Sequence, residues 1–150
     1  MEVRFIQAAE THPLRLQVLR PGGSPADAVF PNDEREGTFH LGAFENGQLL
    51  GIGSFYPERH RSFKGPKQFR LRGMATSPDH RGRGIGAKLL LHGLEHLHAQ
   101  GTEVIWCNAR VKAAPFYARL HFTTEGEIFE LPGIGMHYLM HRKVQLASAH

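Results

Sequence analysis

Short segments in which apolar residues alternate with polar or small ones recur along the chain, and this period of two is typical of β-strands. The dipeptide Asn46-Gly47 separates two of these segments and favours a tight hairpin. Gly73, inside another segment, indicates a bulge or a close approach of the backbone. The strands predicted in this way are Val3–Ala9, Phe39–Glu45, Gln48–Tyr56, Lys67–Thr76, Thr102–Cys107, Thr123–Glu130 and Met136–Arg142.

A helical period of three to four residues is clearest over Gly84–Gln100. A shorter helix is predicted to begin after Thr11 as its N-cap, with Pro13 in the first turn, and another covers Lys112–Leu120. The polar stretch 21–38 is typical of a long loop, and long loops in compact domains are often functional. This order predicts a mixed α/β fold with a strand–helix–strand unit at its centre.

The composition is that of an ordinary globular protein, with 41% hydrophobic and 21% charged residues. The 150 residues suit one domain over 1–150, in which we expect 143–150 to be a loose tail. The longest apolar runs are too short to span a membrane. Because the single cysteine, Cys107, cannot form an internal disulfide, we expect a cytoplasmic protein.

Positive charge is in excess, since 18 lysines and arginines and 14 acidic residues give a net charge of +4. This excess suits anionic partners such as phosphates, nucleotides or nucleic acid. Many of the basic residues crowd between Arg59 and Lys88. The same stretch contains the glycine-rich segment that carries the clearest chemical signal.

Three alternating glycines, Gly82, Gly84 and Gly86, stand between a predicted strand and the longest predicted helix. Glycine lets the backbone turn tightly and leaves its N–H groups accessible. The first turn of a helix adds unpaired N–H donors and a partial positive charge. This arrangement predicts a cradle for a phosphate or pyrophosphate. The spacing fits neither a Walker loop nor the G-x-G-x-x-G fingerprint of dinucleotide-binding folds.

The pattern Arg81-x-x-Gly84-x-Gly86 resembles the acyl-CoA pyrophosphate loop of the GNAT (GCN5-related N-acetyltransferase) superfamily. After the next strand, Tyr117 and Phe122 in NARVKAAPFYARLHF are similar to a second motif of that family. The ending LPGIGMHYLM is similar to a small, single-domain bacterial branch related to ElaA. We therefore use this family as the source of expectations about fold and chemistry.

The resemblance implies a central, mostly antiparallel, twisted sheet of about six or seven strands, splayed at the cofactor site and flanked by about four helices. It implies direct transfer of an acetyl group from acetyl-CoA to a primary amine in a ternary complex, with a small molecule favoured over a protein as acceptor. Neither a metal nor a membrane is implied, and nucleic acid is disfavoured as a partner. A homodimer would be in keeping with the family.

The resemblance also implies roles for individual residues. Tyr117 matches the tyrosine that protonates the departing thiolate, for which a neutral phenol is suited. An asparagine common in the family falls on Arg110 here, which leaves open whether Asn108 or Arg110 contacts the cofactor. The residues implied to bind acetyl-CoA are Met74, Ala75, Thr76, Arg81, Gly82, Arg83, Gly84, Ile85, Gly86, Ala87, Asn108 and Tyr117.

The general base is left open, and a relay of water molecules could also serve. Acids of the long loop, Asp33, Glu34 and Glu36, could attract a cationic amine, and the basic stretch 59–72 is expected to contact CoA phosphates or an acidic acceptor. The candidates for the base, all on or beside predicted strands, are His40, Glu45, Glu127, Glu130, His137 and Tyr138.

Other functions compete with this interpretation. His92-x-x-Glu95-His96 matches a zinc-protease pattern, but no third ligand is indicated. Cys107 could accept the acyl group in a ping-pong scheme, although packing in the core is favoured for a lone cysteine. The alternatives to an enzyme are a CoA-binding sensor without catalysis and a basic nucleic-acid-binding domain. Against the latter, the basic stretch 59–72 lacks the regularly interleaved aromatic residues on which bases would stack.

Overall fold

The structure, a computed structural model, describes residues 1–145. The hairpin predicted around Asn46-Gly47 is confirmed, since both residues have the positive φ that a type I′ turn requires, 50° and 77°. The hairpin belongs to a seven-stranded sheet. Its strands are β1 Glu2–Ile6, β2 Phe39–Glu45, β3 Gln48–Pro57, β4 Gln68–Thr76, β5 Val104–Arg110, β6 Thr123–Leu131 and β7 Gly135–Lys143.

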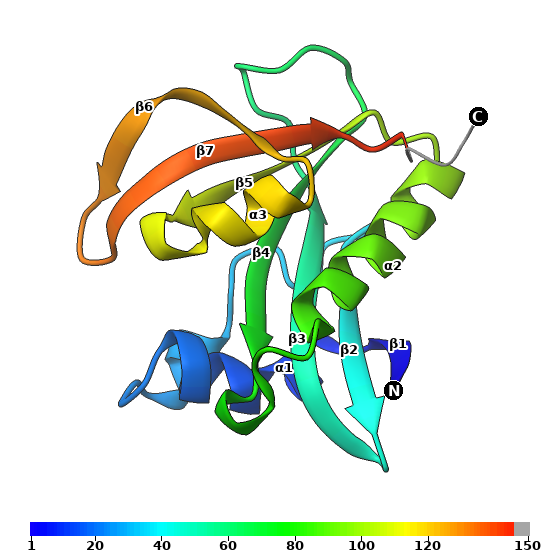
Figure 1. Cartoon of the computed structure of the whole chain (residues 1–150), viewed down its shortest axis with the longest axis vertical. Helices are drawn as coiled ribbons and strands as arrows, with labels where there is room; N and C mark the ends of the chain where they lie inside the picture. The colour runs from blue at the N-terminus through cyan, green and yellow to red at the C-terminus, as the bar shows by residue number, and fades with distance from the viewer. Residues whose placement is uncertain (146–150) are drawn as a thin grey trace.

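The strands lie in the order β1-β2-β3-β4-β5-β7-β6 across the sheet (Figure 1). β4 and β5 are parallel, because the helix α2 (Ile85–Ala99) crosses between them, and the other neighbouring strands are antiparallel. The expected mostly antiparallel sheet is therefore confirmed. β7 runs to Lys143 and Val144 is buried, so the sheet and the core reach into the predicted tail over 143–150. Residues 146–150 of that tail lie outside the described residues.

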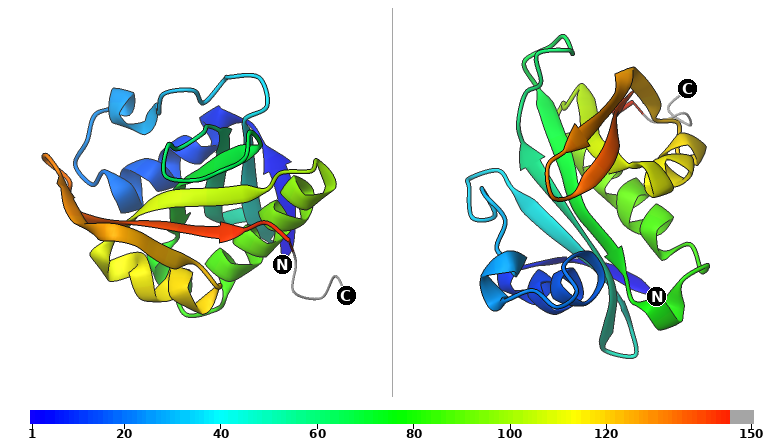
Figure 2. Two further views of the ribbon diagram at one scale, coloured as in Figure 1. Left: turned by 90° about the horizontal axis from the view of Figure 1, so that it is seen from above. Right: turned by 90° about the vertical axis from the view of Figure 1, so that its left-hand side faces the viewer.

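Helices cover both faces of the sheet (Figure 2). α1 (Ala8–Leu14) and the π-helical turn Arg15–Leu19 lie on one face, whereas α2 and α3 (Ala114–Arg119) lie on the other. None of the helices in residues 1–145 is long and apolar enough to cross a membrane. The apolar face expected for α2 is confirmed by burial of Ile85, Leu89, Leu90, Leu94 and Leu97. Short 3₁₀ turns occupy Pro25–Ala28, Pro78–His80 and Val111–Ala113.

The first helix begins earlier than the sequence pattern predicts. α1 starts at Ala8, which shortens the preceding strand, and its N-cap is Gln7 instead of Thr11. The cause is a reciprocal capping box, in which the Glu10 carboxylate accepts a hydrogen bond from the N–H of Gln7 at 2.6 Å. Thr11 is buried within the helix, and Pro13 is also inside it and not in the first turn.

A buried ion pair fastens the long loop 21–38 to the sheet. Arg15 has 0% of its surface exposed, and its two terminal nitrogens lie 2.7 and 3.0 Å from the carboxylate oxygens of Asp33. The same guanidinium donates to the hydroxyls of Ser54 at 3.0 Å and Tyr56 at 3.2 Å, both on β3. Tyr56 in turn donates to Asp33 at 2.5 Å. Loop, helical turn and sheet therefore share one network.

Replacing Asp33 with asparagine is expected to destabilise the fold strongly, because Arg15 would keep a buried charge without a counter-ion. Removing one partner of a buried pair costs about 3–5 kcal/mol. Urea unfolding at pH 7 measures the loss. The control is Glu2→Gln, which breaks the exposed pair with Arg4 and should change the free energy of unfolding little. Equal stability of Asp33→Asn and wild type would contradict this role of the pair.

The stability that the pair provides should depend on pH. Burial alone would raise the pKa of Asp33, but hydrogen bonds from Arg15, Tyr56 and the Phe30 N–H outweigh burial and hold the pKa below its usual 3.8. The contribution of the carboxylate is therefore complete above about pH 4 and is lost as the pH falls through the lowered pKa. Unfolding curves at decreasing pH should show the difference between wild type and Asp33→Asn shrinking below about pH 4.

Candidate active site

β4 and β5 separate midway along their length. They pair only where Gln68–Arg70 lies beside Val104–Trp106, although β4 continues to Thr76 and β5 to Arg110. The gap opens toward the end of β4 that leads into α2, with α3 close by (Figure 1). The splay expected in the middle of the sheet is therefore present.

A bulge in β4 accompanies this separation. Gly73 and Met74 together face the single residue Gly53 of β3. Gly73 has φ 68°, a left-handed conformation that favours glycine. The bulge predicted from Gly73 is thus confirmed, and it lies where the strands part.

One cavity, of about 500 Å³, lies between the end of β4, the start of α2 and α3. We call it the glycine-loop cavity. All residues that the sequence predicts to bind the cofactor line it, with the exception of Arg83 and Asn108. Phe116, Arg119 and Leu120 of the α3 region complete its wall.

The glycine loop leaves its backbone open. Gly84, the residue before α2, has φ 75°, and Gly82 has φ 78°. A Cβ atom at either glycine would meet no atom within 4 Å, so free space lies over both. The 15-residue helix α2 adds unpaired N–H donors and a partial positive charge at this point. Arg81 lines the cavity, whereas Arg83 is held 2.7 Å from Glu45 on the surface. The loop is suited to bind an anion.

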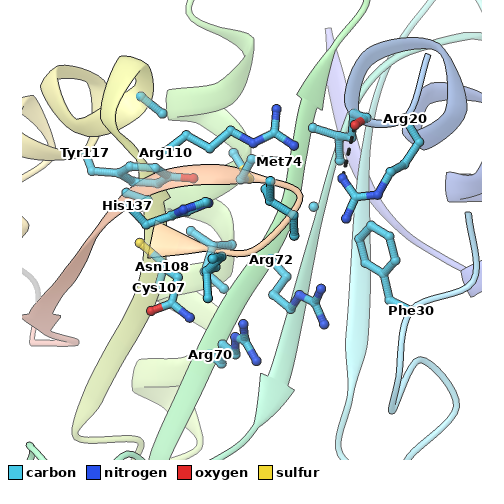
Figure 3. A pocket seen from close by; sticks show the side chains of 17 residues that line it. Arg20, Phe30, Arg70, Arg72, Met74, Cys107, Asn108, Arg110, Tyr117 and His137 are labelled. Carbon is cyan, nitrogen blue, oxygen red and sulfur yellow. Dashed lines mark hydrogen bonds between the residues drawn. The ribbon is translucent and has the colours of Figure 1, made fainter. Parts of the chain in front are cut away.

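A second cavity, of about 220 Å³, lies on the other side of the splay (Figure 3). We call it the arginine cavity. Tyr117 and His137 stand on one side of it, and Arg20 and Phe30 stand on the other, with Met74 and Arg72 between them. Its charged and polar side chains are Arg20, Arg70, Arg72, Asn108, Arg110, Tyr117 and His137.

The two cavities share part of their wall. Met74, Ala113 and Tyr117 line both. Met74 comes from the bulged end of β4, and Tyr117 comes from α3. A group bound at this wall could therefore be reached from either cavity.

Tyr117 lies at that wall with a protonated hydroxyl. Its side chain is buried, and no hydrogen-bond partner of its hydroxyl lies within residues 1–145. Burial, with a smaller effect of Cys107, raises the pKa of Tyr117 far above its usual value. The phenol is therefore neutral at physiological pH and keeps the proton that an acid must donate.

Among the candidate bases, His137 is the one that lines the arginine cavity. Its Nδ1 lies 2.8 Å from the carbonyl oxygen of Gly135, which can only accept a hydrogen bond. Nδ1 therefore carries a proton, and in the neutral form of the ring the lone pair lies on Nε2.

The other candidates are engaged or directed elsewhere. His40 is buried between the hydroxyl of Ser54 at 2.7 Å and the carbonyl oxygen of Asp33 at 3.0 Å. Glu45 pairs with Arg83. The remaining ones lie outside both cavities, and they are Glu127, Glu130 and Tyr138.

Cys107 is a core residue at the edge of the arginine cavity. Burial raises the pKa of its thiol to about 12, so the thiolate that a ping-pong reaction needs is scarce at pH 7. The zinc-protease pattern lies on α2, where the ring of His96 packs against Phe39 at 4.6 Å between centroids. Within residues 1–145, no cluster of three His, Cys, Asp or Glu side chains is arranged to hold a metal ion.

The structure does not support the expectation for the acidic loop, and it narrows the expectation for the basic stretch 59–72 to Arg70 and Arg72. Asp33 is paired with the buried Arg15, and neither Glu34 nor Glu36 lines either of the two cavities. The basic loop 58–67 follows β3 at the end of the sheet opposite the glycine loop (Figure 1), which keeps it away from a phosphate bound there. Of the basic residues in the stretch 59–72, Arg70 and Arg72 line one of these two cavities, the arginine cavity.

The structure also brings in residues that the sequence pattern does not single out. Arg20 and Phe30 reach the arginine cavity from the segment around the long loop. No local motif marks them. Arg70 and Arg72 had a detectable signal, because two arginines spaced by two in a predicted strand point to the same face.

Comparison with known proteins agrees with this arrangement. The model of the acetyltransferase (GNAT) family matches residues 9–122. A protein of Bacillus subtilis (strain 168), described as an uncharacterized N-acetyltransferase and named YitI, is 37% identical over 145 residues, which is 97% of each chain.

Two solved structures have the same fold at lower identity. An aminoglycoside 6′-N-acetyltransferase complexed with coenzyme A superposes with a TM-score of 0.78 at 12% identity, over 97% of this chain and 98% of the other. ElaA of Escherichia coli gives 0.74 at 18% identity, over 94% and 98%. Given the family match over most of its length and the relative at 37% identity, the chain belongs to the acetyltransferase (GNAT) family and is an acyl-CoA-dependent N-acetyltransferase.

Proposed function

We propose that this enzyme moves an acetyl group from acetyl-CoA directly to a primary amine while both substrates are bound. The observation that carries the proposal is the wall of Met74, Ala113 and Tyr117 that the two cavities share. A thioester in the glycine-loop cavity and an amine in the arginine cavity would meet there. The size of the arginine cavity, about 220 Å³, favours a small-molecule acceptor over a folded protein surface.

The glycine-loop cavity has the features that acetyl-CoA needs. The open backbone at Gly82 and Gly84, with Arg81 beside it, suits the pyrophosphate, and the first turn of α2 contributes Ile85, Gly86 and Ala87. The part of β4 that has no partner strand on the β5 side, Met74–Thr76, offers backbone groups to the pantetheine arm.

The proposed chemistry assigns one task to each group at the wall. Acetyl-CoA supplies the acetyl group as a thioester. Nε2 of His137 accepts a proton from the acceptor ammonium, and the freed nitrogen attacks the carbonyl carbon. Backbone N–H groups near Met74 and Ala75 stabilise the negative charge on the carbonyl oxygen. Tyr117 gives its proton to the sulfur as the carbon–sulfur bond breaks.

The bonds and protons balance in this scheme. One carbon–nitrogen bond forms and one carbon–sulfur bond breaks. The nitrogen loses one proton to His137 before attack, and the proton that it releases on becoming an amide replaces the one given up by Tyr117. No acyl-enzyme is needed, in keeping with the raised pKa of the Cys107 thiol.

Replacing Tyr117 with phenylalanine is expected to lower kcat about 100-fold or more, because the thiolate would leave without its acid. Affinity for acetyl-CoA, measured by calorimetry, should change little. Tyr138→Phe is a matched control, since this tyrosine packs against the core outside both cavities. Wild-type kcat of Tyr117→Phe at saturating amine would remove Tyr117 as the acid.

Replacing Gly84 with glutamate is expected to abolish micromolar binding of acetyl-CoA in calorimetry, because a carboxylate would enter the open anion cradle. Gly126→Glu is the control, since Gly126 has a similar φ of 77° and equally open surroundings but lies on β6. Unchanged binding by folded Gly84→Glu would place the cofactor elsewhere. Binding without turnover of any primary amine would favour the non-catalytic sensor.

Replacing His137 with glutamine is expected to lower kcat/KM about 100-fold for an amine that is protonated at the assay pH. An amine that is already neutral at that pH needs no base and should lose much less. Equal losses for both kinds of amine would show that His137 serves the structure of the site and not proton removal.

A further inference from the structure

We infer that the acceptor amine carries an oxyanion, a carboxylate or a phosphate, and that the arginines of the arginine cavity recognise it. This inference rests on the proposed function, because it concerns the acceptor of that same reaction. It starts from the charges that line the cavity. Four arginines contribute to its wall and no aspartate or glutamate does, and they are Arg20, Arg70, Arg72 and Arg110.

The positive charge of these arginines is poorly compensated within the protein. Arg72 makes neither a hydrogen bond nor an ion pair with any residue in 1–145, and Arg20 donates only to the carbonyl oxygen of Leu19 at 3.1 Å. Arg70 has one carboxylate near it, that of Glu58 at 3.4 Å, and its Nε is buried without a partner. The buried Arg15 nearby differs in having a full counter-charge, since Asp33 binds both of its terminal nitrogens, although its Nε is also buried without a partner.

An aromatic platform holds two of the arginines together. The ring of Phe30 is buried, and the guanidinium carbons of Arg72 and Arg20 lie 4.8 and 5.5 Å from its centroid. Like charges gathered on one ring repel each other. Burial lowers the pKa of Arg72, and the positive charges of Arg70, Arg20 and Arg15 lower it further. An anion between Arg72 and Arg20 would relieve this repulsion and would receive forked hydrogen bonds.

The position of these arginines fits the chemistry at the shared wall. Arg20 and Phe30 stand across the cavity from Tyr117 and His137 (Figure 3). An acceptor whose anion is held near Arg20 and Arg72 would therefore direct its amine toward the proposed base and acid. A polycationic acceptor would meet the same field as repulsion, because no acidic side chain lines the cavity.

The first test compares matched primary amines with the wild-type enzyme by following release of the CoA thiol. The pairs are 2-aminoethyl phosphate against ethanolamine and β-alanine against β-alaninamide, with spermidine as the polycation. We expect kcat/KM to be at least about 10-fold higher for the anionic member of one pair, and the better pair separates phosphate from carboxylate. Equal or higher kcat/KM for ethanolamine, β-alaninamide or spermidine would overturn the inference.

The second test replaces Arg72 with glutamine. We expect kcat/KM to fall about 10- to 100-fold for the amine that carries the anion. The kcat/KM of the matched amine without the anion and the Kd of acetyl-CoA should change little. Arg61→Gln is the matched control, because Arg61 is an exposed residue of the basic loop that lines neither cavity. A similar loss of kcat/KM for the matched amine without the anion would show that Arg72 does not recognise the anion.

A binding measurement separates failure of the inference from failure of the proposed function. Inorganic phosphate and malonate should stabilise wild type against heat in the presence of CoA, and should stabilise Arg72→Gln less. If no amine is acetylated but this difference is found, the anion site stands and the proposed transfer fails. If amines are acetylated without preference for anions and neither probe distinguishes the variants, the transfer stands and the anion site fails.

Discussion

Arg15 has no exposed surface, and its hydrogen bonds join the long loop and β3 to one guanidinium. Asp33 supplies the counter-charge from the long loop, Ala28 accepts from the same loop, and Ser54 and Tyr56 accept from β3. A buried charge is tolerable only when it is paired and hydrogen-bonded. The loop and the sheet therefore hold one another in place through this residue, and the wall of the arginine cavity that the loop forms depends on it.

The packing around Arg15 also constrains β4, the strand that lines both cavities. Phe30 donates its N–H to Asp33 at 2.9 Å, and its ring lies 3.9 Å from the Arg15 guanidinium carbon. A Cβ atom at Gly73 would come within 3.2 Å of that ring and 3.6 Å of Nε of Arg15. The bulge thus needs glycine for its positive φ and also for the close approach of Phe30. The network under the loop and the opening between β4 and β5 consequently fit together as one packing arrangement.

Features determined by neighbours in the chain could be predicted from the sequence. The Asn46-Gly47 hairpin, the buried face of α2 and the glycine loop depend on turn chemistry and on period, and they were predicted correctly. The position of Asn108 was not, because the predicted strand ended at Cys107 whereas β5 continues to Arg110. Asn108 and Arg110 line the arginine cavity on this longer strand, together with Cys107 and Ala109.

Contacts between distant segments left no local trace. Asp33 resembles any acid of a polar loop until Arg15, 18 positions earlier, is known to lie against it. Phe30 is a single aromatic residue in the same loop, and its role depends on three arginines from two separate segments, Arg15 and Arg20 at the helical turn and Arg72 on β4. Tertiary packing decides such partners, and a pattern read along the chain does not contain it.

The bulge at Gly73 explains how one strand can contribute to both cavities at the splay. Side chains of a regular strand alternate, so Met74 would lie on the same face as Arg70 and Arg72. The extra residue reverses this order: Ala75 packs against Leu14 on the α1 face, while Met74 packs against the core on the α2 face. Arg72 of the arginine cavity is thereby followed two residues later by Met74, a residue of the wall that the two cavities share with Tyr117. A regular β4 would turn Met74 to the face of Arg70 and Arg72 and away from the core on the α2 face.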